Sequence, residues 1–186
     1  MQNMKSEQKK RNKLNLRDLV VLSIFGAMMF SSKIVMGFLP NIHLIGALII
    51  IVTVVYRAKA LYSIYIFVFL TGIFQFGMWW YAYLYIWTIL WGMVMLLPKS
   101  MPKKISVPVY MIVCGLHGLL FGVFYAPFQA LMFGLDFKGM IAWIVAGFPF
   151  DITHCISNVC CGLLIVPMIE VMKKLLVRQK KVDYTF

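Results

Sequence analysis

Three polar side chains lie within one strongly apolar stretch near the end of the sequence. Asp151, His154 and Asn158 follow one another at i, i+3 and i+7, which places all three on one face of a helix. Because an ionised carboxylate in hydrocarbon is costly, an Asp with a His one turn later predicts a functional site inside a membrane. Asp151 also follows Pro149, so it could instead cap the first turn of a helix. The two roles are compatible.

The hydrophobic composition of the whole sequence indicates a membrane protein. Of the 186 residues, 62% are hydrophobic and only 13% are charged, which lies outside the range of soluble domains. The net charge of +12 would suit nucleic acid, but the basic residues occupy short segments between apolar runs. We therefore predict an all-α, polytopic membrane protein that contacts the lipid bilayer and binds no nucleic acid.

The apolar runs predict six transmembrane helices in residues 19–175, between a basic leader (1–18) and a basic tail (176–186). Sixteen of the eighteen Lys and Arg residues fall in the leader, in residues 173–181 near the C-terminus or in two short loops near residues 57–59 and 99–104. Cytoplasmic loops carry an excess of basic residues, so both termini and these loops are expected on the cytoplasmic side.

Two of the six predicted helices need irregular backbone near their outer ends. The second apolar run, residues 44–56, is too short for an upright span unless its helix begins near Phe38 and bends at Pro40. The fifth helix is expected to kink or end at Pro127.

The sixth helix is also expected to be broken. As one helix, residues 139–172 would be about 50 Å long, so a break is predicted near Gly147 and Pro149. The broken ends of the fifth and sixth helices would then meet beside Asp151.

Further polar and aromatic residues each allow two interpretations. Lys33 either snorkels to the outer interface or points inward at an anionic ligand group or at Asp151. His117 is more often a hydrogen-bonded packing residue than a ligand. Five aromatic residues lie close together, namely Trp79, Trp80, Tyr81, Tyr83 and Tyr85. They form either an aromatic belt at the membrane interface or a surface on which a planar ligand stacks.

Familiar catalytic and metal-binding patterns are missing from the sequence. It contains no phosphate-binding loop of the G-x-x-x-x-G-K-[ST] kind, no H-E-x-x-H and no G-x-S-x-G. Uphill transport would therefore need partner subunits or an ion gradient. The histidines are spread over different segments, so neither a metal site nor a cofactor is predicted. Four cysteines lie in apolar runs and are interpreted as packing residues: Cys114, Cys155, Cys160 and Cys161.

The final helix opens with F-P-F-D-x-x-H-x-x-x-N, and the first helix carries Ser23, Ala27 and Ser31 at four-residue spacing. With six predicted helices and a basic leader, the chain resembles the S components of energy-coupling factor (ECF) vitamin transporters. The small residues match the family's Ala-x-x-x-Ala pattern, with serine at two of the three positions.

The resemblance implies a non-enzymatic subunit of the plasma membrane that binds a vitamin-like molecule. It implies partnership with a transmembrane T subunit, through Ser23, Ala27 and Ser31, and with two cytoplasmic ATPases. The ligand is expected near the outer face, and the aromatic residues favour a planar ring, as in riboflavin, a pterin, a queuosine precursor or a tryptophan-like compound. The predicted binding residues are Asp151, His154, Asn158, Lys33, Asn41, His43, Gln75, Trp79, Trp80, Tyr85 and Gln129.

Two other functions fit parts of the pattern. An autonomous proton-coupled carrier would use Asp151 and His154 as a proton relay, although the hydropathy shows no inverted repeat. An intramembrane enzyme would use His154 with Asp151 and Ser157, but Ser157 lies on a different edge of the helix and no nucleophile motif is present.

Overall fold

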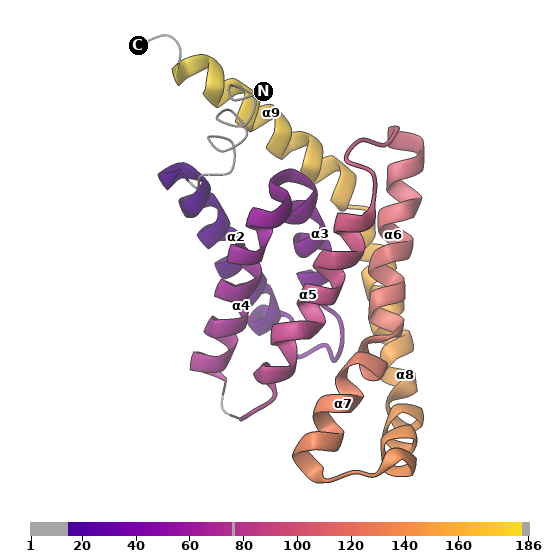
Figure 1. The fold of residues 1–186 in the computed structure, drawn as a ribbon. Helices are drawn as coiled ribbons and strands as arrows, with labels where there is room; N and C mark the ends of the chain where they lie inside the picture. Colours follow the sequence, from indigo (N-terminus) through magenta and orange to yellow (C-terminus); the bar gives the residue numbers. More distant parts are fainter. Residues whose placement is uncertain (1–14, 76, 184–186) are drawn as a thin grey trace, which may run out of the picture.

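The computed structural model describes residues 15–75 and 77–183, and in this part of the chain it contains helices and no strands (Figure 1). The predicted all-α class is thus confirmed. Most of the basic leader lies outside the described residues. The elements are α2 (Leu16–Val35), α3 (Ile45–Tyr56), the 3-10 helix η1 (Arg57–Lys59), α4 (Ala60–Phe74), α5 (Trp80–Leu96), α6 (Lys103–Leu119), α7 (Phe121–Phe133), α8 (Phe137–Gly162) and α9 (Ile165–Asp183).

Four helical stretches of the described chain are long and apolar enough to cross a membrane. They are Leu16–Val35, Ile45–Phe74, Lys103–Phe133 and Phe137–Gly162, and the shorter α5 is also apolar. Within the second stretch the chain reverses direction at Arg57, so that α3 and α4 lie side by side (Figure 1). This architecture is that of a helical membrane protein.

The connections that carry most of the basic residues lie at one end of the molecule. The start of α2, the α3–α4 turn, the α5–α6 loop and α9 are together at this end (Figure 1). We call it the basic end, and its described basic residues are Arg17, Arg57, Lys59, Lys99, Lys103, Lys104, Lys173 and Lys174. The charge pattern predicted such a clustering, because basic segments alternate with apolar runs along the chain.

Helix α3 forms the centre of the bundle. Its first nine residues, from Ile45 to Thr53, are all buried, as expected for a helix that is hydrophobic on every side. Helices α2, α4, α5, α6, α8 and α9 all contact it. Since α3 is enclosed by protein rather than lipid, its 12 residues do not have to match the thickness of the bilayer.

The second helix does not begin near Phe38, the start that an upright span would have required. Residues 36–41 form turns, and α3 begins only at Ile45. Pro40 lies within these turns, where its missing N–H costs no helical hydrogen bond. Asn41 takes a left-handed conformation with φ of 60°, which Asn tolerates better than most residues. The prediction of irregular backbone at this end of the helix is confirmed.

The fifth predicted helix does not end at Pro127, because it is already interrupted at Leu120, between α6 and α7. Pro127 lies inside α7. The N–H of Gly122, in the first turn of α7, donates to the side chain of Asp151 instead of continuing the ladder of α6. A partner on α8 thus satisfies a backbone group that the break leaves free.

The sixth predicted helix is interrupted in a different place from the one predicted. Helix α8 runs without interruption through Gly147 and Pro149 and ends at Gly162. Pro149 is exposed on the surface of the helix, where membrane helices tolerate proline. The chain turns at residues 163–164, and this turn lets α9 bury Ile165 and Ile169 in the core.

Candidate functional site

Asp151, His154 and Asn158 all face the interior of the bundle. They are 5%, 1% and 0% exposed, so the predicted polar face of this helix is confirmed. The alternative that Asp151 caps its own helix is wrong, because Asp151 lies in the middle of α8. The face packs on α6 and α7, where Gly118 and Gly122 allow a close approach of the helices.

The Asp151 carboxylate binds the start of a neighbouring helix. The backbone N–H of Gly122 donates to both carboxylate oxygens, at 3.1 and 3.2 Å. Because the N-terminus of α7 carries a partial positive charge, a carboxylate at this position is stabilised. A Cβ atom on Gly122 would collide with the carboxylate, so this contact requires glycine.

His154 lies one turn further along α8, among aromatic rings. Its imidazole is edge-on to His43, with the ring centres 4.7 Å apart, and 4.9 Å from the ring centre of Phe121. Trp87 joins the same group through contacts with His43, His117 and Phe121. We use the name polar cluster for His43, His117, Asp151, His154 and Asn158.

Several polar atoms of this cluster are buried without a hydrogen-bond partner among the described residues. They include both ring nitrogens of His154, the Nδ1 atoms of His43 and His117, and the Oδ1 atom of Asn158. A buried polar atom left unpaired costs about 1–3 kcal/mol, so native structures seldom keep several together. Such a concentration is typical of a site that another molecule completes.

The existing hydrogen bonds of the cluster indicate which groups are free. The Nε2 atom of His117 lies 3.1 Å from the carbonyl oxygen of Ile86. Since a carbonyl only accepts, Nε2 carries the proton and Nδ1 of the neutral ring is a free acceptor. The Nδ2 atom of Asn158 donates to the Cys114 carbonyl at 3.0 Å, which leaves Oδ1 as a second acceptor.

His43 brings a third imidazole from the turn before α3. Burial lowers the pKa of His43 to about 4, and the nearby positive charge of Lys33 also lowers it. The ring is therefore neutral at pH 7. Asn41, two residues earlier, is half-buried in the same turn, and its predicted role in closing over a ligand stays a prediction.

Lys33 takes the inward orientation of the two that the sequence allowed, but it does not pair with Asp151. Its ammonium group donates to the side-chain oxygen of Gln75 and lies 4.8 Å from the centre of the Tyr83 ring. Tyr83 in turn contacts Trp87 edge-on, at 5.8 Å between ring centres. Lys33 and Gln75 are thus linked to the polar cluster through aromatic rings.

The predicted aromatic residues separate into two groups. Trp79 and Tyr85 are exposed, and each joins α7 through a hydrogen bond rather than facing the cluster. Trp80 stacks on Tyr81 at 4.2 Å between ring centres and covers Gly72. These contacts favour the packing and interface interpretation for the three rings.

Sequence reasoning missed two aromatic residues that contact the polar cluster, Trp87 and Phe121. It named Tyr83 in the aromatic cluster but not among the binding residues, and it interpreted His117 as a packing residue. Tyr83 and Trp87 lie four residues apart, on one face of α5, and this spacing was the available signal. Gln129 is buried in α7, and its Oε1 atom has no hydrogen-bond partner among the described residues.

The row of small residues on the first helix lies on its outer side. Helix α2 buries Leu22, Phe25, Gly26 and Met29 against the bundle. Ala27 and Ser31 are exposed and Ser23 is half-buried. This row, with its exposed neighbours Ile24 and Met28, is therefore open to lipid or to another helix.

Metal binding finds no support within the described residues, where no group of three His, Cys, Asp or Glu side chains could hold an ion. The four cysteines are free thiols. Cys114 is buried at the Asn158 contact and packs against Gly46, as expected for a packing residue.

No family model, curated protein or solved structure matches the chain. What the site can do must therefore be argued from its geometry.

Proposed function

We propose that the chain is the substrate-binding S component of an ECF-type importer, a multi-pass protein of the plasma membrane with its basic end in the cytoplasm. The ligand is a vitamin-like molecule with a planar ring and hydrogen-bonding atoms. The observation that carries the proposal is the polar cluster, in which several buried imidazole and amide atoms lack partners among the described residues of an otherwise apolar bundle.

The chemistry of the cluster supports a flat, polar heterocycle as the ligand. His117 and Asn158 offer acceptors, and each neutral imidazole of His43 and His154 can both donate and accept. Trp87 and Phe121 border the imidazoles edge-on, so the surroundings of the polar cluster are aromatic. A site that hydrogen-bonds its ligand discriminates strongly against analogues without those groups, because its own polar atoms would then stay unpaired.

The outer face of α2 supports the partner part of the proposal. Small residues at four-residue spacing allow a second helix to approach closely in lipid. Ala27 and Ser31 are exposed and Ser23 is half-buried, so this row remains accessible to a partner helix. The T subunit of the importer would dock on this row, and two cytoplasmic ATPases would supply the energy for release of the ligand inside.

The two rival functions receive no support from the geometry. A proton relay or a catalytic dyad needs a hydrogen bond between its members. Neither ring nitrogen of His154 has a partner among the described residues, so Asp151 and His154 are not linked. The Oγ atom of Ser157 is also unpaired and therefore does not donate to His154.

The test is purification of the tagged chain from its native membrane, with mass spectrometry of the co-purifying proteins and small molecules. We expect a T subunit, paired ATPases and a retained ring compound. His154→Ala should lower the affinity for the retained compound about five- to 150-fold, since a lost hydrogen bond to a buried group costs about 1–3 kcal/mol.

Thr153→Ala is the matched control, because Thr153 is the preceding residue of α8 but is exposed. It should retain the compound at the wild-type level. Recovery of the chain alone, together with uptake driven by a pH gradient in vesicles, would contradict the proposal and favour the proton-coupled carrier.

A further inference from the structure

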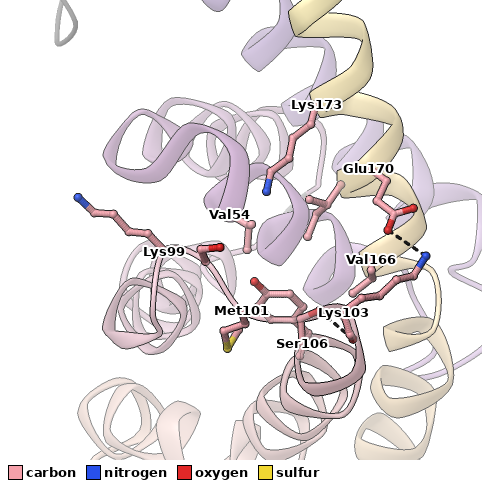
Figure 2. A pocket seen from close by; sticks show the side chains of 11 residues that line it. Val54, Lys99, Met101, Lys103, Ser106, Val166, Glu170 and Lys173 are labelled. Atoms are coloured by element: carbon pink, nitrogen blue, oxygen red, sulfur yellow. Dashed lines mark hydrogen bonds and ion pairs between the residues drawn. The ribbon is translucent and has the colours of Figure 1, made fainter.

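A small pocket lies at the basic end, far along α6 from the polar cluster. It has a volume of about 130 Å³ and lies between the end of α3, the loop before α6, and α9 (Figure 2). The polar residues that line it are Lys99, Ser100, Lys103, Ser106, Glu170 and Lys173.

The pocket is positively charged. Its three lysines outnumber its one carboxylate, and that carboxylate is already paired, since Glu170 Oε1 lies 2.9 Å from the Nζ atom of Lys103. The hydrogen bond from Lys103 lowers the pKa of Glu170, so the pair is ionised at neutral pH. In Figure 2 the Lys173 side chain extends from α9 toward the pocket, whereas that of Lys99 points away from it.

The backbone around the pocket adds to its preference for anions. Helix α6 begins at Lys103 without a side-chain cap, and the free N–H groups of a helix N-terminus attract negative charge. Lys103, Ser106 and Tyr110 lie on one face of the first two turns of α6, and all three line the pocket. The N-terminus of α6 thus adds its partial positive charge to that of the lysines around the pocket.

The remaining lining is apolar. Val54, Met101, Val166 and Ile169 form it, and Val166 and Ile169 also belong to the buried core. A site with lysines and hydroxyls next to apolar side chains matches the boundary between lipid headgroups and acyl chains, where basic pockets between helices bind anionic headgroups.

We propose that this pocket binds the phosphate group of an anionic phospholipid. Lys173 contacts the phosphate, the start of α6 donates to it, and the apolar residues contact the first carbons of the lipid. The volume suits the ligand, because a water molecule occupies about 30 Å³ and a phosphate group needs the space of only a few waters.

This inference does not depend on the proposed transport function. The pocket and the polar cluster share no residue. Failure of one proposal therefore leaves the other unaffected.

The experiment uses the full-length chain purified in detergent and exposed to an equal mixture of phosphatidylglycerol and phosphatidylcholine. Native mass spectrometry then measures the ratio of the two bound lipids. We expect the wild-type chain to prefer phosphatidylglycerol. Lys173→Gln should reduce that preference about fivefold, which is the effect of one lysine near an anionic membrane surface.

Lys174→Gln is the matched control. It removes the same charge from the next residue of α9, but Lys174 does not line the pocket. The proposal expects the preference to stay close to wild type. Equal losses in the two variants would overturn the proposal, because they would show diffuse attraction instead of a site.

Two further measurements complete the test. Glu170→Gln removes the carboxylate of the pocket and should raise the preference for phosphatidylglycerol, so the proposal can be tested even if Lys173→Gln does not fold. Displacement of the lipid by inorganic phosphate, without discrimination between the two lipids, would overturn the lipid assignment and assign the pocket to a soluble phosphate compound.

Discussion

The basic end and the polar cluster differ in the exposure and the pairing of their polar groups. At the basic end the charges are partly exposed and some of them are paired, as in the ion pair of Lys59 with Asp18 at 2.7 Å and the bond from Arg57 to the Met95 carbonyl at 2.9 Å. The polar cluster contains three imidazoles, an amide and the Asp151 carboxylate, and four of these five side chains are buried. Several of the imidazole and amide atoms have no hydrogen-bond partner among the described residues.

The difference separates two roles that polar groups have in a membrane protein. Paired charges at an interface orient the chain and contribute modest stability. Unpaired buried groups reduce stability, so their presence in this chain indicates a role outside folding. Three experiments test this contrast, beginning with the one for which we expect the largest effect.

Gly122→Ala should break the packing beside the polar cluster. The added Cβ atom would collide with the Asp151 carboxylate, so α7 or α8 must shift and the hydrogen bond from the Gly122 N–H is lost. We expect a loss of about 3 kcal/mol in the free energy of unfolding, at the upper end of the range for overpacking. Denaturant titration in detergent would measure it.

Gly147→Ala provides the control, since no atom lies within 4 Å of a Cβ atom placed there. Alanine replaces glycine inside a helix at this position, so the variant should be as stable as wild type or more stable by about 0.5–1 kcal/mol. Equal stability of the Gly122 and Gly147 variants would contradict the tight contact between α7 and α8.

Acid should destabilise the polar cluster through His43. Its pKa is about 4 in the folded chain and about 6.5 in the unfolded chain. Between these values the unfolded state binds more protons, so stability falls as the pH falls. The contribution of His43 amounts to about 2 kcal/mol between pH 7 and pH 5.

The variant His43→Gln isolates this effect, because glutamine is polar but does not titrate. Its free energy of unfolding should fall about 2 kcal/mol less than that of wild type over the same pH interval. An identical pH dependence of the two proteins would show that His43 is solvated in the folded state.

Asp18→Asn should have the smallest effect, because it breaks an ion pair at the basic end. Both side chains are partly exposed, at 16% for Asp18 and 21% for Lys59, so we expect a loss below about 1 kcal/mol. The loss should shrink further in high salt, which screens exposed charges. Thermal unfolding at low and high salt measures both, and a loss as large as that of Gly122→Ala would contradict the contrast.

The sequence by itself determined the properties that depend on local pattern. Hydrophobic content and the positions of the basic residues predicted a helical membrane protein with a basic end. The spacing of Asp151, His154 and Asn158 predicted one buried face, because the helical period alone decides which residues share a side. These features need no knowledge of how the helices pack.

Only the tertiary structure decided which residues meet. The breaks at residue 120 and at residues 163–164 are absent from the sequence prediction, which relied on Pro127 and Pro149. A proline ends a helix only where no neighbour or exposed surface accommodates it, whereas burial of α9 and the bond from Gly122 to Asp151 favour the observed breaks. Likewise Phe121 contacts Trp87, His117 and His154 through the packing of distant helices, which local periodicity does not encode.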